Sequence, residues 1–197
     1  MSGAEAKQEP SNRNAGILIP VFSIRTESDL GIGDVGGLRE FVDWAADTGF
    51  EFVQLLPINE TGTDNSPYNA ISSVALEPLT IDCSPSAIPE LEEEEFESAL
   101  TNYNLRELRQ GPVKYEDVRV LKLDLLWRAF VEFESDHFQK GTDRDEAFHR
   151  FCDRESKWLG DYCLYRLLMD MEGGRQNWQD WGEGHNDITK ARQFVDR

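Results

Sequence analysis

A strand–helix–strand pattern within residues 15–58, followed by about a hundred residues of helical periodicity, constrains the fold of this chain more than any other feature. Two short apolar runs, at 15–22 and 52–56, are bounded by polar or turn residues. Unbroken apolar runs of this length are typical of strands that are buried on both faces of a parallel sheet. The two runs therefore predict two buried strands.

The segment between these runs has the pattern of an amphipathic helix. Asp34 stands where a helix N-cap is expected, and Gly49 stands where the helix should end. Apolar residues recur at i, i+3, i+4 and i+7 between these two positions, namely Leu38, Phe41, Val42 and Ala45. A strand, a helix and a second strand in this order predict a parallel pair with a right-handed crossover.

The residues after 84 predict helices rather than strands. The acidic run from Glu90 to Glu97 is interpreted as a solvated helix face. Residues 115–138 are predicted to form a helix, in which a set of apolar residues keeps the spacing of one face: Leu123, Leu126, Trp127, Phe130 and Phe133. One long helix is predicted over 143–171, and the start of another over 187–197.

Two parallel strands alone would leave both edges of a sheet open, which proteins rarely allow. Either the helices cover the sheet, or the chain is the front part of a longer barrel. We favour the second account: an α/β fold that is a partial (β/α)8 TIM barrel, its first βαβ unit followed by a helical insertion subdomain. The expected parts are a disordered lead-in (1–14), the first barrel strands and helix (15–83), the helical insertion (84–186) and a further helix at which the chain is truncated (187–197).

Charge and cysteine content limit the classes of partner and the cellular compartment that are expected for this chain. The chain has 20 Lys and Arg against 38 Asp and Glu, a net charge of −18. Such a surface repels phosphate backbones and anionic lipids, so neither nucleic acid nor a membrane is expected as a partner. Cys152 and Cys163 are expected on one helix, about 16 Å apart, too far for a disulfide. Reduced thiols indicate the cytoplasm.

The polar segment after the second apolar run carries the candidate binding residues. It contains Ser66, Tyr68 and Asn69, an aromatic ring between two small hydrogen-bonding side chains. Loops that leave the carboxyl ends of parallel strands hold ligands in α/β folds, and such a ring suits the apolar face of a sugar. The alternative is that residues 64–67 form a simple turn. Trp178 and Trp181 are interpreted as packing anchors rather than sugar platforms.

Other chemistries have weaker signals. Residues 31–36 match G-x-G-x-x-G, but about ten residues separate them from the strand, and Asp34 would place a carboxylate where a pyrophosphate should bind. These glycines are therefore assigned to a loop and a capped helix. The three histidines are scattered without ligand spacing, so no metal site is expected. Spacing alone identifies no catalytic centre.

Taken in order, a series of motifs resembles the N-terminal region of the 4-α-glucanotransferases, the amylomaltases or disproportionating enzymes of glycoside hydrolase family 77. The matching segments extend from residue 15 to about 181 and are Gly16-Ile17-Leu18 through Phe22-Ser23, Gly31-Ile32-Gly33-Asp34, Phe41-Val42-Asp43-Trp44-Ala45, Gln54-Leu55-Leu56-Pro57, Thr61-Gly62, Ser66-Pro67-Tyr68, Trp158-Leu159-Gly160-Asp161-Tyr162 and Gly173-Gly174 with Trp178.

The resemblance implies a (β/α)8 barrel and the transfer of α-1,4-glucan segments between maltooligosaccharides, with retention and without a metal or organic cofactor. In that mechanism one carboxylate attacks the anomeric carbon and a second acts as acid and then base. The resemblance places both on later barrel strands, so no catalytic residue is expected in this chain. It implies that Tyr68 stacks on a donor sugar and that Ser66 adds a polar contact; Asn69 is added for its position alone. The alternative is a non-catalytic maltooligosaccharide-binding or partner-binding module derived from the family.

Overall fold

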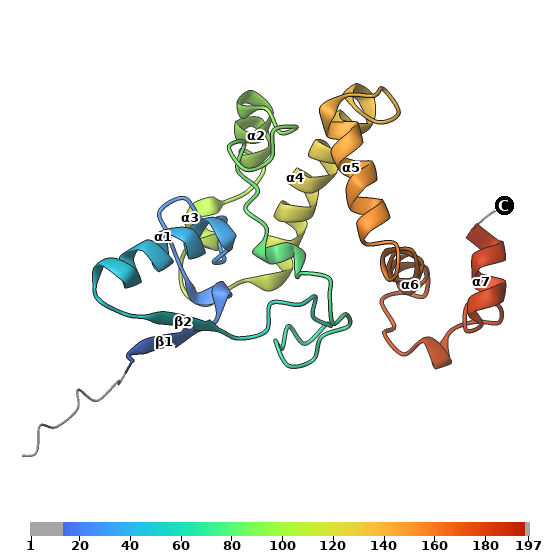
Figure 1. Ribbon diagram of the computed structural model, residues 1–197, viewed down its shortest axis with the longest axis horizontal. Helices are drawn as coiled ribbons and strands as arrows, with labels where there is room; N and C mark the ends of the chain where they lie inside the picture. Colours follow the sequence, from blue (N-terminus) through green and yellow to red (C-terminus); the bar gives the residue numbers. More distant parts are fainter. Residues whose placement is uncertain (1–13, 196–197) are drawn as a thin grey trace, which may run out of the picture.

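The computed structural model describes residues 14–195. The expected lead-in therefore lies almost wholly outside the described residues. The chain runs from a two-stranded sheet at one end of the molecule to a helix, α7, at the other (Figure 1). Within the described part, no helix is both long and apolar enough to cross a bilayer.

The predicted strand–helix–strand unit is confirmed. Strand β1 (Gly16–Ile19) pairs in parallel with β2 (Phe52–Leu55), and α1 (Val35–Asp47) connects them. Asp34 caps α1, because its Oδ1 accepts hydrogen bonds from the backbone N–H groups of Gly36 and Gly37 at 3.1 and 3.2 Å. Gly49 follows the helix with a φ of +89°, a left-handed conformation that glycine adopts without strain.

The prediction that both strands are buried on both faces was wrong. Along each strand, exposed and half-buried residues alternate, and Leu18 and Phe52 remain 59% and 50% exposed. Helix α1 packs on the sheet through β2, and successive side chains of a strand point to opposite faces, so every second residue is left exposed. On the predicted face of α1, Ala45 is buried but Val42 lies exposed.

The α-helices after residue 84 agree with the prediction of a helical region, whereas the 3-10 helices at 21–23 and 78–80 were not predicted. The remaining elements comprise the short 3-10 helices Val21–Ser23, Pro78–Thr80 and Trp178–Asp180, and the α-helices α2 (Glu93–Leu100), α3 (Leu105–Leu108), α4 (Tyr115–Asp136), α5 (Asp143–Arg154), α6 (Leu159–Met171) and α7 (Ile188–Val195).

The predicted long helix over 143–171 is two helices. The backbone leaves the helix at 155–158, where Trp158 donates its Nε1–H to Glu155 Oε2 at 2.7 Å. Cys152 and Cys163 consequently lie on different helices, α5 and α6, and not on one. Both thiols are free, as predicted.

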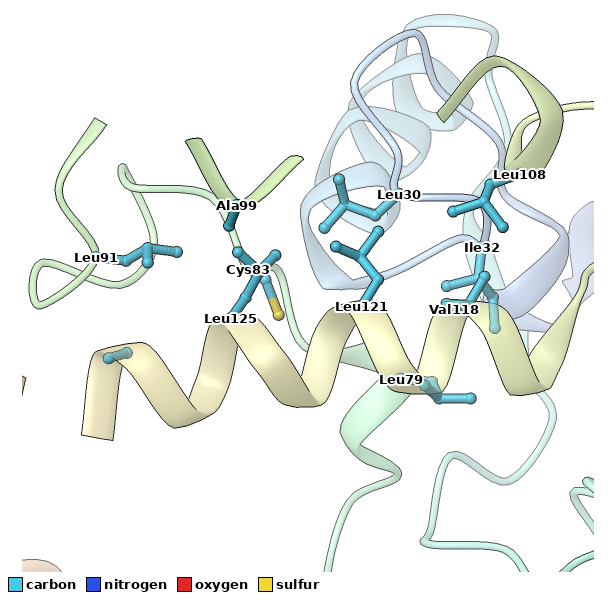
Figure 2. Packing of buried hydrophobic residues seen from close by; sticks show 11 residues of the cluster. Leu30, Ile32, Leu79, Cys83, Leu91, Ala99, Leu108, Val118, Leu121 and Leu125 are labelled. Atoms are coloured by element: carbon cyan, nitrogen blue, oxygen red, sulfur yellow. The ribbon is translucent and has the colours of Figure 1, made fainter. Parts of the chain in front are cut away.

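The main core forms on one face of α4. Val118, Leu121 and Leu125 point from this helix toward residues of the segment between the two strands and of the segments after β2 (Figure 2). Their buried partners are Leu30, Ile32, Leu79, Cys83, Leu91, Ala99 and Leu108. The face that the sequence pattern identified is a different one, since Leu123, Trp127 and Phe130 are 45%, 63% and 48% exposed. Helix α4 is apolar on two sides, and the smaller aliphatic side chains form the packed one.

A charged residue lies inside this core. Lys122 exposes none of its side chain, and its ammonium donates to Asp34 Oδ2 at 3.1 Å, Leu79 O at 2.8 Å and Ile81 O at 2.7 Å. A buried ammonium is tolerated only when it is paired and hydrogen-bonded. Lys122 therefore connects α4 to the N-terminal cap of α1.

The acidic run is only partly a solvated face. Glu90 is 6% exposed and accepts a hydrogen bond from Arg144 Nη2 at 2.8 Å. Burial raises its pKa, but the Arg144 guanidinium outweighs burial, so the pKa of Glu90 is lowered. The prediction of a solvated face fails here because Arg144, on α5, is 54 residues away in the chain.

Candidate functional site

The candidate site lies at the carboxyl ends of β1 and β2. Because Ile19 pairs with Leu55 in a parallel register, the segments that follow both strands leave the same edge of the sheet. A cavity of about 40 Å³ lies between these segments, next to Tyr115 of α4. Its volume is that of about one water molecule, so a sugar ring would have to bind over the segments rather than between them.

Residues 59–77, which follow β2, form what we call the Tyr68 loop. The backbone of Glu60 donates to Ala75 O at 2.9 Å and accepts from Ile71 N at 2.8 Å. Antiparallel bridges join Asn59 to Leu76 and Thr61 to Ala70. The Tyr68 loop is therefore held by backbone pairing on both sides of Glu60.

The tip of this loop is a turn, as the alternative interpretation predicted. Asp64 Oδ1 accepts the N–H of Ser66 at 3.1 Å, and Asp64 Oδ2 accepts from Asn69 Nδ2 at 2.9 Å. The hydrogen bond from Asn69, followed by that from the Ser66 N–H, lowers the pKa of Asp64. Asn65 completes the turn with a φ of +52°.

The three candidate binding residues lie together at this tip. The Tyr68 side chain is 75% exposed, whereas Ser66 Oγ accepts the Tyr68 N–H at 3.4 Å and Asn69 is engaged with Asp64. An exposed phenol ring on a braced turn can present its face to a ligand, while Asn69 maintains the turn.

Two carboxylates of the Tyr68 loop, Glu60 and Glu77, are buried, and neither was identified from the sequence. Glu60 is 2% exposed. It accepts the hydroxyl of Tyr162, and its Oε1 lies 3.2 Å from Arg166 Nε. Burial raises the pKa of Glu60, and the contacts with Tyr162 and Arg166 offset this rise only in part.

The second buried carboxylate, Glu77, fixes the start of the loop. Its Oε2 accepts from Thr61 N at 2.9 Å and from Thr61 Oγ1 at 2.8 Å, and its Oε1 accepts from Arg119 Nη1 at 3.3 Å. Arg119 Nη2 also donates to Asn65 Oδ1 at 3.3 Å. In a chain with 38 acidic residues, nothing in the local sequence distinguishes these two from solvated ones.

Comparison with known proteins gives the family. The model of the family described as 4-alpha-glucanotransferase matches residues 19–196. The chain belongs to the 4-alpha-glucanotransferase family. Among the relatives, the 4-alpha-glucanotransferase of Chlamydia caviae is 34% identical over 185 residues, which cover 91% of this chain and 32% of the relative. That of Chlamydia trachomatis is 40% identical over 157 residues, covering 79% of this chain and 28% of the relative.

The fold agrees with this membership. An amylomaltase from Streptococcus agalactiae, solved in complex with acarbose, superposes with a TM-score of 0.67 at 22% identity, covering 92% of this chain and 35% of that one. The chain thus spans about a third of the length of these 4-alpha-glucanotransferase relatives.

The two tryptophans that follow Gly173-Gly174 have different environments. Trp181 is 5% exposed, packs on Tyr165 with ring centroids 5.3 Å apart and donates its Nε1–H to Arg175 O at 2.6 Å. It is a packing anchor, as predicted. Trp178 is 51% exposed at the rim of a groove of about 530 Å³ between α6 and α7, so the prediction is wrong for this residue.

In the described residues of the present chain, no group of three or more His, Cys, Asp or Glu residues is arranged to hold a metal ion. The two buried carboxylates of the loop, Glu60 and Glu77, are already bonded to Tyr162, Thr61 and two arginines. Both carboxylates thus hold the loop in place through contacts within the protein.

Proposed function

We propose that this chain forms the donor-sugar side of a 4-α-glucanotransferase, which transfers α-1,4-glucan segments between maltooligosaccharides by a retaining double displacement. Residues 15–83 would begin a (β/α)8 barrel, and residues 84–186 would form a helical insertion subdomain. Membership in the family, the parallel β1–β2 pair and the amylomaltase neighbour with its acarbose ligand support this assignment.

One observation carries the proposal: the Tyr68 ring is 75% exposed on a braced turn at the carboxyl end of the strands. Such a ring can stack on the C–H face of a glucose unit, with the Ser66 hydroxyl and the Asn69 amide oxygen beside it for the sugar hydroxyls, while the Asn69 amide nitrogen holds the turn. The catalytic acid pair of the retaining mechanism lies, in this proposal, outside these residues. The engagement of Glu60 and Glu77 in internal contacts supports that part.

Calorimetric titration with maltoheptaose tests the binding function. We expect binding by the 197-residue chain and a three- to tenfold weaker affinity, about 0.6–1.4 kcal/mol, in Tyr68→Ala. Trp127→Ala is the matched control, because Trp127 is an aromatic residue 63% exposed on α4, about two helical turns beyond Arg119, which contacts the loop. Equal affinities of Tyr68→Ala and the unchanged protein would contradict the proposed role of Tyr68.

Chromatography of oligosaccharides after incubation with maltotriose tests the absence of catalysis. We expect that this chain alone forms no products, neither oligosaccharides longer than maltotriose nor shorter ones. Products formed by the 197 residues would show that an acid pair lies within them. The alternative, a non-catalytic maltooligosaccharide-binding module, also predicts binding without products. The two hypotheses are separated by testing a longer protein that contains this chain, since transfer activity there would favour the transferase.

A further inference from the structure

The Tyr68 loop is attached to two helices of the predicted insertion, α4 and α6, through two separate sets of buried contacts. We propose that Glu60 and Glu77 are positioning residues that hold this loop on α6 and α4, and thereby fix where Tyr68 meets a glucan. The inference deepens the proposed function and rests on it for the identity of the ligand.

The attachment to α6 passes through Glu60. Its donors, Tyr162 and Arg166, are four residues apart and therefore share one face of α6. The other charged groups that act on this carboxylate are Glu77 and Arg119. Because the Glu60 backbone pairs with both Ile71 and Ala75, a displacement of its side chain would move the pairing on both sides of the loop.

The attachment to α4 passes through Glu77 and Arg119. Glu77 takes two hydrogen bonds from Thr61 and one from Arg119, and the same guanidinium reaches Asn65. Asn65 directly precedes Ser66 in the turn that carries Tyr68. Arg119 consequently contacts both the base and the tip of the loop.

The Tyr68 ring itself has no such support. Within residues 14–195, no side-chain hydrogen bond or ring contact holds the phenol. The backbone N–H of Tyr68 donates a hydrogen bond to Ser66 Oγ. The place of the ring is therefore determined by the loop backbone, which the two attachments hold. A contact that pre-forms a binding loop improves affinity by removing the cost of ordering it.

The test compares Tyr162→Phe and Arg119→Met with matched controls. Tyr103→Phe also removes a hydroxyl that donates to a carboxylate, that of Asp124, and Arg150→Met removes an arginine from a surface pair with Glu146. Hydrogen exchange at the amides of Gly62 and Ile71 reports on the loop without any ligand, because both amides bond within it. Calorimetry with maltoheptaose and thermal melting complete the measurements.

We expect each loop variant to accelerate exchange at these two amides about tenfold and to weaken maltoheptaose binding about three- to tenfold, and the controls to change neither. Leu125→Val, which shortens a core side chain of α4, should lower the melting temperature and leave the affinity unchanged. Unchanged exchange at Gly62 and Ile71 in Tyr162→Phe and Arg119→Met would overturn the inference. A loss of maltoheptaose affinity in Leu125→Val as large as that in the two loop variants would also overturn it. If the unchanged protein binds no maltoheptaose, the proposed function fails, while the exchange rates still decide whether Glu60 and Glu77 position the loop.

Discussion

Replacing Lys122 by methionine should be among the most destabilising single substitutions in this chain. Methionine keeps most of the apolar stem, so packing is largely preserved. The change leaves Asp34 Oδ2 and the carbonyl oxygens of Leu79 and Ile81 without the donor that lies 2.7–3.1 Å from each. Breaking a buried ion pair by removing one partner costs about 3–5 kcal/mol. Against a typical stability of about 5–15 kcal/mol, such a loss is a large fraction of the whole.

Urea unfolding, followed by circular dichroism and extrapolated linearly to water, measures this loss. We expect Lys122→Met to lower the free energy of unfolding by about 3–5 kcal/mol with little change in the denaturant slope. Adding Asp34→Asn to Lys122→Met should restore part of the loss, because no unpaired carboxylate then remains buried. Lys114→Met is the control, since Lys114 pairs with the exposed Glu107 at the surface and its loss should hardly move the midpoint. A loss below about 1 kcal/mol in Lys122→Met would refute the reasoning that this ammonium holds the core together.

Three further predictions concern individual side chains. Gly33→Ala should lower the free energy of unfolding by at least about 2 kcal/mol in the same urea assay, because its Cβ would lie 2.1 Å from Val21 O; a stable Gly33→Ala protein would contradict the close backbone approach. Gly160→Ala should raise stability by up to about 1 kcal/mol, since the position is helical and open, and a fall would show that a contact is missing from this account. Burial raises the pKa of the Cys83 thiol from 9.0 to about 11. The unfolded chain therefore releases this proton first, and the stability that Cys83 contributes should be complete below pH 9 and lost as the pH rises to about 11. The decline should be smaller in Cys83→Ala, and equal declines in the two proteins would exclude Cys83 as its cause.

Local patterns predicted the elements of this fold well. The cap at Asp34, the stop at Gly49 and the alternation of strand and helix are signals that a few neighbouring residues carry. The break between α5 and α6 escaped prediction because residues 155–158 contain neither glycine nor proline. There the contact between Glu155 and Trp158 replaces the usual markers of a helix end.

Contacts between distant residues could not be predicted in the same way. Helix α4 is apolar on two sides, and the choice of its packed side depends on residues that lie tens of positions earlier. From the sequence, Lys122 would be predicted to lie at the surface. Its three acceptors are 88, 43 and 41 positions away in the chain and become apparent only in the structure. Likewise, the sequence predicted Tyr68 as a candidate for binding, but it did not predict the arginines and the tyrosine that attach its loop to α4 and α6.

The main core also bears on how the chain is made. Leu30 and Ile32 are buried by a helix that begins at Tyr115, so a growing polypeptide emerging from the ribosome exposes them for more than eighty residues of synthesis. During that interval Leu30 and Ile32 lack their partners on α4. Apolar side chains exposed in this way favour aggregation, so a pause in translation before Tyr115 would lengthen the time during which the chain can aggregate.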